Sequence, residues 1–141
     1  MDQDQPKTKK VYVIDGTDFS TLAEFYDVVS CTLIPGAFWG RNLDAFNDIL
    51  RGGFGTPEDG FILRWKNSQL SRIRLGHEET VRVLEERLLH CHPTNRELVT
   101  EKISDARQGV GETIFDTLVE IIHVHCPGGY EDGDSVELVL E

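Results

Sequence analysis

The stretch GAFWGRNLDAFNDIL, residues 36–50, sets two aromatic residues between glycines and then begins an amphipathic pattern. Asn42 is a favoured helix N-cap. The apolar residues after it recur at helical spacing and predict a short helix with one buried face: Leu43, Phe46, Ile49 and Leu50. Asp44 and Asp48 are four residues apart on that helix, where two like charges cost about 0.3 kcal/mol. They form either an ordinary solvated face or a surface that binds something positive.

The segments around this helix alternate between strand-like and helix-like patterns. Runs of β-branched and aromatic residues, or strict alternation, predict strands at residues 9–16, 61–65 and 135–141. Helical spacing with caps and Pro or Gly stops predicts helices at residues 21–33, 43–50, 77–92, 94–108 and 111–125, and about one helical turn at 67–72. Strands separated by helices predict an α/β fold with a small three-stranded parallel sheet covered by helices, in a three-layer-like arrangement.

The length of 141 residues suits one domain with a real core. We expect residues 1–8 to be a disordered tail and residues 9–141 to form a single domain, with an extra helical insertion at about 77–108. No apolar run reaches the roughly 18 residues that span a bilayer. No hydrophobic segment follows the N-terminal lysines either, so we expect a cytoplasmic protein. The three cysteines, an odd number without a CxxC motif, are expected to be free thiols.

The composition is strongly acidic, since 25 Asp and Glu against 14 Lys and Arg give a formal net charge of −11. Such a surface repels nucleic acid and anionic membranes, so we expect neither as a partner. It also accelerates the encounter with a cationic protein. The alternative interpretation is that the charge only keeps the protein soluble.

Motifs for catalysis or metal binding are not found in the sequence. It has no glycine-rich phosphate loop, nucleophile elbow or HExxH, so we expect no enzymatic activity and no cofactor. His90-Cys91-His92 and His123-Val124-His125-Cys126 contain zinc-ligand residue types. Residues two apart on a helix do not face each other, however, and both clusters end predicted helices, where His is favoured. We therefore expect no metal site.

The segment FWGRNLDAFNDIL, residues 38–50, closely resembles a segment of the barstar family, the intracellular inhibitors of secreted ribonucleases. That family shows aromatic-aromatic-Gly-x-Asn-Leu-Asp-Ala-x-x-Asp-x-Leu at this place. The opening VYVIDG, the strand FILRW that ends in Trp, and the final helix and alternating strand resemble the family as well. The resemblance covers about residues 9–75 and 109–141.

The resemblance implies a monomeric inhibitor that plugs the cationic active site of a basic, extracellular-type ribonuclease or nuclease toxin. Asp48 matches the family's central acid, and Glu120 matches a further acid when ETIFDTLVEII is aligned on the last long helix. The implied partner-binding residues are Phe38, Trp39, Gly40, Asn42, Asp44, Asn47, Asp48 and Glu120. Of the two adjacent aromatics we expect Phe38 at the surface and the other in the core. Asn47 and Arg41 depart from the family pattern, which favours a changed partner. An acidic interaction module with a different cationic partner is the alternative.

Overall fold

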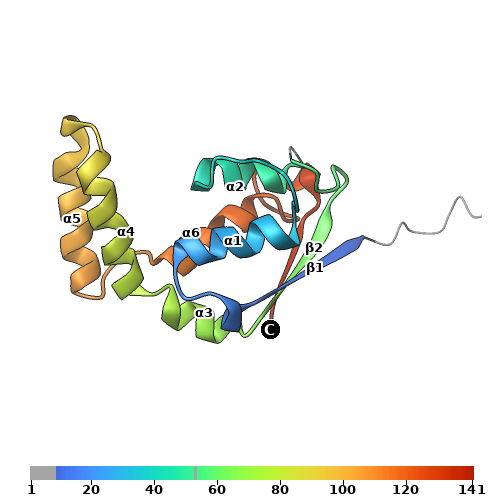
Figure 1. Ribbon diagram of the computed structural model, residues 1–141, viewed down its shortest axis with the longest axis horizontal. Coiled ribbons are helices and arrows are strands. Elements are labelled where there is room, and N and C mark those ends of the chain that lie inside the picture. The colour runs from blue at the N-terminus through green and yellow to red at the C-terminus, as the bar shows by residue number, and fades with distance from the viewer. Residues whose placement is uncertain (1–8, 53) are drawn as a thin grey trace, which may run out of the picture.

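The computed structural model describes residues 9–52 and 54–141, so the predicted disordered tail, residues 1–8, and Gly53 lie outside the described residues. Figure 1 shows the arrangement of the strands and helices along these residues. The strands are β1 (Lys10–Asp15), β2 (Phe61–Lys66) and β3 (Glu137–Leu140). The helices are α1 (Leu22–Thr32), α2 (Leu43–Leu50), α3 (Ser68–Arg74), α4 (His77–His90), α5 (Arg96–Arg107) and α6 (Ile114–Val124). None of these helices is both long and apolar enough to cross a membrane.

The three strands form one parallel sheet in the order β1-β2-β3. Leu63 of the central strand lies opposite Tyr12 of β1 on one side and opposite Leu138 of β3 on the other. The predicted α/β fold with a small three-stranded parallel sheet is therefore confirmed.

The helices α1, α2 and α6 pack on one face of this sheet (Figure 1). Tyr12 and Ile14 of β1 point into the core, whereas Val11 and Val13 point to the other face and are 46% and 41% exposed. For the described residues, the predicted three-layer-like arrangement is therefore wrong, and the sheet and its helices make two layers. Right-handed crossovers that step in one direction across a sheet leave their helices on the same face, which explains the result.

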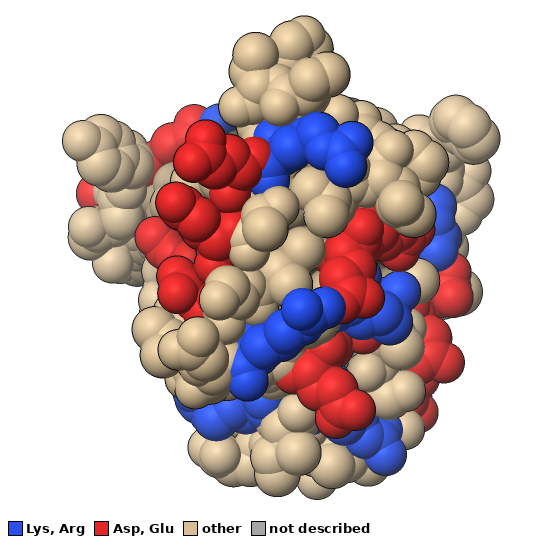
Figure 2. All heavy atoms as spheres, turned by 90° about the vertical axis from the view of Figure 1, so that its left-hand side faces the viewer, with Lys and Arg blue, Asp and Glu red and all other residues tan. Residues whose placement is uncertain are grey.

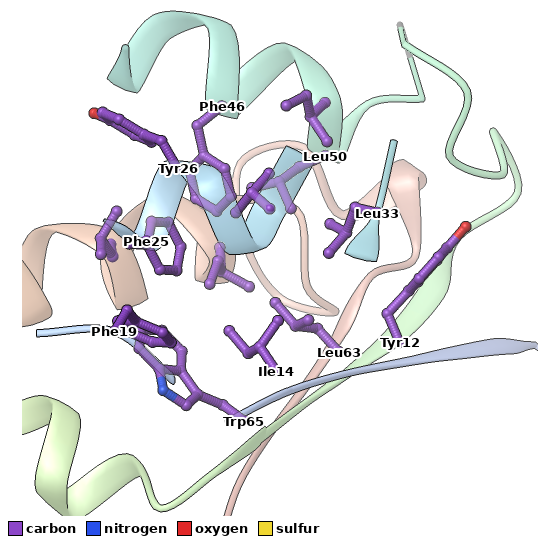
Figure 3. Packing of buried hydrophobic residues seen from close by; sticks show 14 of the residues in the cluster. Tyr12, Ile14, Phe19, Phe25, Tyr26, Leu33, Phe46, Leu50, Leu63 and Trp65 are labelled. Carbon is purple, nitrogen blue, oxygen red and sulfur yellow. The ribbon is translucent and has the colours of Figure 1, made fainter. Parts of the chain in front are cut away.

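The core lies between the sheet and these helices, and aromatic rings fill much of it (Figure 3). Phe25 of α1 stacks on Trp65 of β2, with ring centroids 5.6 Å apart. Phe25 also meets Phe46 of α2 edge to face, at 5.4 Å between centroids. Burial of rings of this size contributes a large share of the stability of a small core. The layer of helices is thus joined to the sheet through α1.

Helix α2 begins and ends where the sequence predicts. The side-chain oxygen of Asn42 accepts a hydrogen bond from the Ala45 N–H at 2.8 Å, so Asn42 is the N-cap. Phe46, Ile49 and Leu50 are buried, as expected from the apolar spacing, whereas Leu43, predicted on the same face, is only half-buried. Because this face is held in the core, the opposite face of α2 is turned to the solvent.

The segment predicted as an insertion, residues 77–108, forms the helical pair α4 and α5, which has a small apolar cluster of its own. Its buried members are Leu84, Val99, Ile103 and Ala106. The pair projects away from the sheet (Figure 1), and Figure 2 shows acidic and basic side chains mixed over that side of the molecule. Ion pairs such as Arg82–Glu79 at 2.6 Å and Arg107–Glu85 at 2.6 Å account for part of this mixture.

The first turn of α4 is hydrogen-bonded to the rest of the protein. Glu79, which is buried, accepts a hydrogen bond from the Leu22 N–H at the start of α1, at 2.8 Å. The hydroxyl of Thr80 accepts one from the Ile114 N–H at the start of α6, at 2.9 Å. The side chains of α4 thus satisfy backbone donors that helix starts leave open. The helical pair is tied to the first and last helices rather than attached only by its ends.

Candidate functional site

The two adjacent aromatics before α2 point to opposite sides. Phe38 is 97% exposed, whereas Trp39 is 5% exposed. The indole N–H of Trp39 donates to the Ser30 hydroxyl at 2.7 Å, and its ring meets Tyr26 edge to face. Phe38 is therefore free to touch a partner, as expected. Trp39 was also expected among the partner-binding residues, but its burial makes it the anchor of the loop on α1.

Gly40, Arg41 and Asn42 form the turn that leads into α2. Arg41 adopts a left-handed backbone conformation with φ of 52°. Its guanidinium donates to the Asp27 carboxylate of α1 at 2.5 Å. This ion pair neutralises the single positive charge of residues 36–50 and fixes the turn against α1. Gly40 is exposed, while the side chain of Asn42 is committed to capping the helix.

Asp44 and Asp48 both lie on the solvent face of α2. Oδ1 of Asp48 accepts a hydrogen bond from Nη1 of Arg51 at 2.7 Å. The same guanidinium binds Glu131 through Nε at 3.0 Å and Nη2 at 2.8 Å. The hydrogen bond to Glu131 is the largest cause of the raised pKa of Arg51. Among the described residues, Asp44 makes no ion pair, so the two acids of α2 differ in their charge environment.

Arg51 and Glu131 are site residues that the sequence patterns did not predict. Arg51 follows Asp48 by three residues, which is a helical pairing distance and a signal that could have been used. Glu131 lies 80 positions from Arg51 in the sequence, so no local pattern could connect them.

Asn47 is turned inward toward a buried histidine. Its Oδ1 lies 2.6 Å from Nε2 of His125, whose Nδ1 lies 2.6 Å from Oδ2 of Asp134. The side chain of His125 is completely buried at the end of α6. Asn47 was predicted as a partner-binding residue, but the structure gives its side-chain oxygen to this internal contact. The histidine thereby links α2 to the loop before β3.

The same histidine belongs to a group of metal-ligating residue types. Within the part of the chain that the structure describes, His125, Glu131 and Asp134 bring their ligand atoms within 4.8 Å of one another. Each of these ligand atoms already has a protein partner. Nδ1 of His125 pairs with Asp134, and Glu131 pairs with the positively charged Arg51. The positive charge of the Arg51 guanidinium beside Glu131 would repel a metal ion. We therefore interpret these contacts as a hydrogen-bond network.

Glu120 on α6 is exposed, as a partner-binding residue must be. It lies near Glu112, which precedes the same helix. The hydrogen bond to Glu120, then burial, then the negative charge of Glu120 raise the pKa of Glu112. The first two turns of α6 and the residues before them therefore carry a second concentration of acidic groups, where a cation from a partner would relieve repulsion.

These features can be compared with known families. The family model Barstar (barnase inhibitor) matches residues 9–101. The chain belongs to the barstar family. The match contains the whole of residues 38–50, and members of the barstar family are inhibitors that bind ribonucleases. Among curated proteins, none matches the chain.

The extent of the barstar match differs from that of the expected resemblance. It runs through α4 and into α5, so part of the helical pair lies inside the region that matches the barstar family. It ends before α6 and β3, which the resemblance had included. The assignment of Glu120 to a family acid therefore depends on the position of α6 in the fold and not on this match.

Proposed function

We propose that this barstar-family protein inhibits a basic ribonuclease by placing α2 and the preceding loop in the active site of the enzyme. In this mechanism the carboxylates of Asp44 and Asp48 occupy the positions of substrate phosphates, and Phe38 packs against the enzyme surface. The main support for the proposal is that the two faces of α2 have different environments. One face is locked in the core by Phe46, Ile49 and Leu50, and the other presents both acids to the solvent.

The proposed binding surface is held in place before a partner arrives. Asn42 caps α2, Trp39 anchors the loop, and Arg51 holds one oxygen of the Asp48 carboxylate. Ordering a flexible side chain on binding costs about 0.5–1.5 kcal/mol, so a surface that is already ordered binds more tightly. A ribonuclease cleft concentrates Arg and Lys to hold phosphates, and charge-assisted hydrogen bonds to fixed carboxylates are strong.

The inhibitor in this proposal works stoichiometrically as a cytoplasmic monomer, without a cofactor and without catalysis. Residues 9–141 act as one unit, since Glu79 and Thr80 join the helical pair to α1 and α6. The net charge of −11 accelerates capture of a basic nuclease.

A second candidate is a barstar-fold module that binds a different cationic protein. It is favoured by Asn47 and Arg41, because their side chains bind residues of the protein itself, His125 and Asp27 respectively. The two candidates share the acidic face of α2 and differ in whether the partner is a nuclease.

The test is titration of the protein against a panel of small basic ribonucleases, with residual RNA cleavage as the readout. We expect stoichiometric loss of activity for at least one enzyme. Asp48→Ala should weaken that inhibition by about 2–5 kcal/mol, mostly through faster dissociation. Glu101→Ala, which removes the same charge from exposed α5, is the control.

Three results would count against this proposal or a part of it. If Asp48→Ala and Glu101→Ala inhibit equally well, the face of α2 is not the binding surface. If the association rate does not slow between low and physiological salt, electrostatic steering plays no part. If the protein inhibits no ribonuclease of the panel, the second candidate is favoured.

A further inference from the structure

A hollow of about 380 Å³ lies where the helical pair α4 and α5 meets the start of α6 (Figure 1). Its lining comes from α4, from α5, from the loop between α5 and α6 and from the first turn of α6, with one residue of α2. This volume is typical of sites that hold small molecules. Asp44 and Asp48 are not part of the lining, so the hollow is separate from the binding surface proposed above.

The floor of the hollow is apolar and buried. Leu84 and Ala106 belong to the apolar cluster of the helical pair, and Ile114 is buried at the start of α6. The Ile114 N–H is already satisfied, because it donates to the Thr80 hydroxyl at 2.9 Å. An occupant therefore meets aliphatic side chains at the floor, which favours an aliphatic group there.

Four charged residues stand at the exposed rim of the hollow, two of each sign. Arg87 of α4 and Lys102 of α5 are cationic, whereas Asp105 of α5 and Glu112 of the following loop are anionic. None of the four forms an ion pair with another described residue. Lys102 and Asp105 are three residues apart on one helix, a spacing at which opposite charges can pair. The four charges are therefore available to a ligand.

Glu112 lies at the end of the hollow nearest α6. The hydrogen bond between Ile114 and Thr80 holds α4 against the first turn of α6, and Glu112 precedes Ile114 by two residues. Arg87 follows Thr80 by seven residues, which corresponds to about 10 Å along α4. The cationic residue of α4 is therefore set about two helical turns farther out than Glu112.

The charges of α5 follow the same order, because α5 returns toward the start of α4. At this place Nε2 of His77 lies 3.1 Å from the carbonyl oxygen of Gly111, in the loop after α5. Asp105 is one turn closer to this loop than Lys102. Both anionic residues thus lie toward α6, and both cationic residues lie toward the outer end of the helical pair.

Glu112 has a specific reason to attract a positive group. The hydrogen bond to Glu120, then burial, then the negative charges of Glu120 and Asp116 raise the pKa of Glu112. A positive group beside Glu112 would favour its ionised form and relieve this repulsion. The end of the hollow near α6 therefore suits an ammonium group.

We propose that this hollow binds a small aliphatic zwitterion, either a neutral amino acid or a short neutral peptide with free ends. Arg87 and Lys102 bind its carboxylate, Asp105 and Glu112 bind its ammonium group, and its aliphatic side chain packs on the floor. A simple anion would leave the two acidic residues unpaired, and a simple cation would leave the two basic residues unpaired. The site is independent of the function proposed above, since it needs no ribonuclease.

The first experiment tests the chemistry of the ligand. The full-length protein is titrated with L-leucine and with L-leucyl-L-alanine, and backbone amide shifts are followed by NMR. We expect saturable shifts at Leu84, Ala106 and Ile114 with at least one of the two, and the tighter ligand shows whether an amino acid or a peptide fits.

Blocked ligands provide the controls for this titration. N-acetyl-leucine lacks the ammonium group and leucinamide lacks the carboxylate, so each should bind about tenfold more weakly than leucine, as should glycine, which lacks the aliphatic side chain. For the dipeptide, the N-acetylated and amidated forms take the same roles. Equal binding of the blocked and free forms, or no saturable shift with either zwitterion, would overturn the proposal.

The second experiment assigns each charge to one end of the ligand. Arg87→Gln and Asp105→Asn should each weaken binding about tenfold. Arg87→Gln should also lose the preference for leucine over leucinamide, and Asp105→Asn the preference over N-acetyl-leucine, which a general structural effect would not produce. Arg96→Gln and Glu101→Gln, exposed on α5 and outside the lining, are the matched controls. If the rim variants bind like these controls, the proposal is wrong.

Discussion

Nη1 of Arg51 lies 2.7 Å from Oδ1 of Asp48, so the acid proposed to bind the partner is already paired within the protein. The other side of the same guanidinium is bound by Glu131, from the far end of the chain. Exposed ion pairs of this kind contribute little to stability, because water and salt screen them. Their larger effect here is on the surface, because the pair orients one carboxylate oxygen of Asp48 and lowers the local negative charge.

Replacing Arg51 should therefore change the approach of a partner more than the stability of the fold. We predict that Arg51→Met raises the association rate with a basic ribonuclease at low ionic strength by about two- to tenfold, because one positive charge leaves the binding face. The gain should shrink at physiological salt. Stopped-flow association measurements at several salt concentrations check this.

The matched control is Arg64→Met. Arg64 also forms a forked ion pair, with Glu141 at 2.6 and 2.9 Å, but it lies on the outer face of the sheet. Both substitutions change the net charge equally. If Arg64→Met accelerated association as much as Arg51→Met, the effect would come from total charge and not from the face of α2.

The adjacent aromatics Phe38 and Trp39 should respond in opposite ways to substitution. Trp39→Ala should lower the free energy of unfolding by about 3–5 kcal/mol, since it removes a buried ring and leaves the Ser30 hydroxyl without its donor. Phe38→Ala should change that free energy by less than about 0.5 kcal/mol and should weaken partner binding. Urea unfolding and a binding titration on both variants separate the two roles. A large stability loss in Phe38→Ala would contradict the assignment.

His125 should be important for the position of α2 as well as for stability. His125→Ala leaves Asn47 and Asp134 without their shared partner and opens a cavity, so we predict a loss of about 2–4 kcal/mol in the free energy of unfolding. Amide hydrogen exchange should speed up in α2 and in the loop before β3. His123→Ala, two residues away and exposed, is the control and should be nearly neutral.

The raised pKa of Glu112 predicts that the free energy of unfolding depends on pH. The pKa of this carboxyl group is raised in the folded protein, by its hydrogen bond to Glu120 first and by burial second. The folded state therefore holds this proton more tightly than the unfolded state. The resulting stabilisation is complete below the ordinary glutamate pKa of about 4.3 and is lost as the pH rises through the raised value.

Removal of the Glu112 charge should abolish the loss of stability at higher pH. We expect Glu112→Gln to be more stable than the unmodified protein at pH 7 by up to about 0.5 kcal/mol, since the group is largely exposed, and to show no gain at low pH. Urea unfolding between pH 3 and pH 7 measures the difference. Glu101→Gln on α5 serves as the control, and an equal gain there would show that only net charge matters.

Local patterns predicted the parts of the site whose causes are local. Asn42, the apolar spacing of Phe46, Ile49 and Leu50, and the four-residue step from Asp44 to Asp48 all act within two turns of one helix. Cap preference and helical periodicity operate over that range, so the bounds of α2 and its outward acids were predictable.

Local patterns were less informative where the environment of a residue is set by a contact with a residue far away in the sequence. Asn47 looked like a surface residue, but its partner is His125, 78 positions away. Trp39 was expected in the core and also among the partner-binding residues, and Ser30 and Tyr26 of α1 enclose it, in agreement with the first expectation. The number of layers was also mispredicted, since it depends on the handedness and direction of both crossovers together.

The sequence by itself determined the α/β class, the capped acidic helix, the helical pair and the resemblance to the barstar family, because propensity, periodicity and motif spacing are written in neighbouring residues. Only the tertiary structure decided that Arg51 couples Asp48 to Glu131 and that His125 joins α2 to the last loop. Those contacts depend on the way the sheet stacks α6 against α2, which no segment of the chain encodes alone.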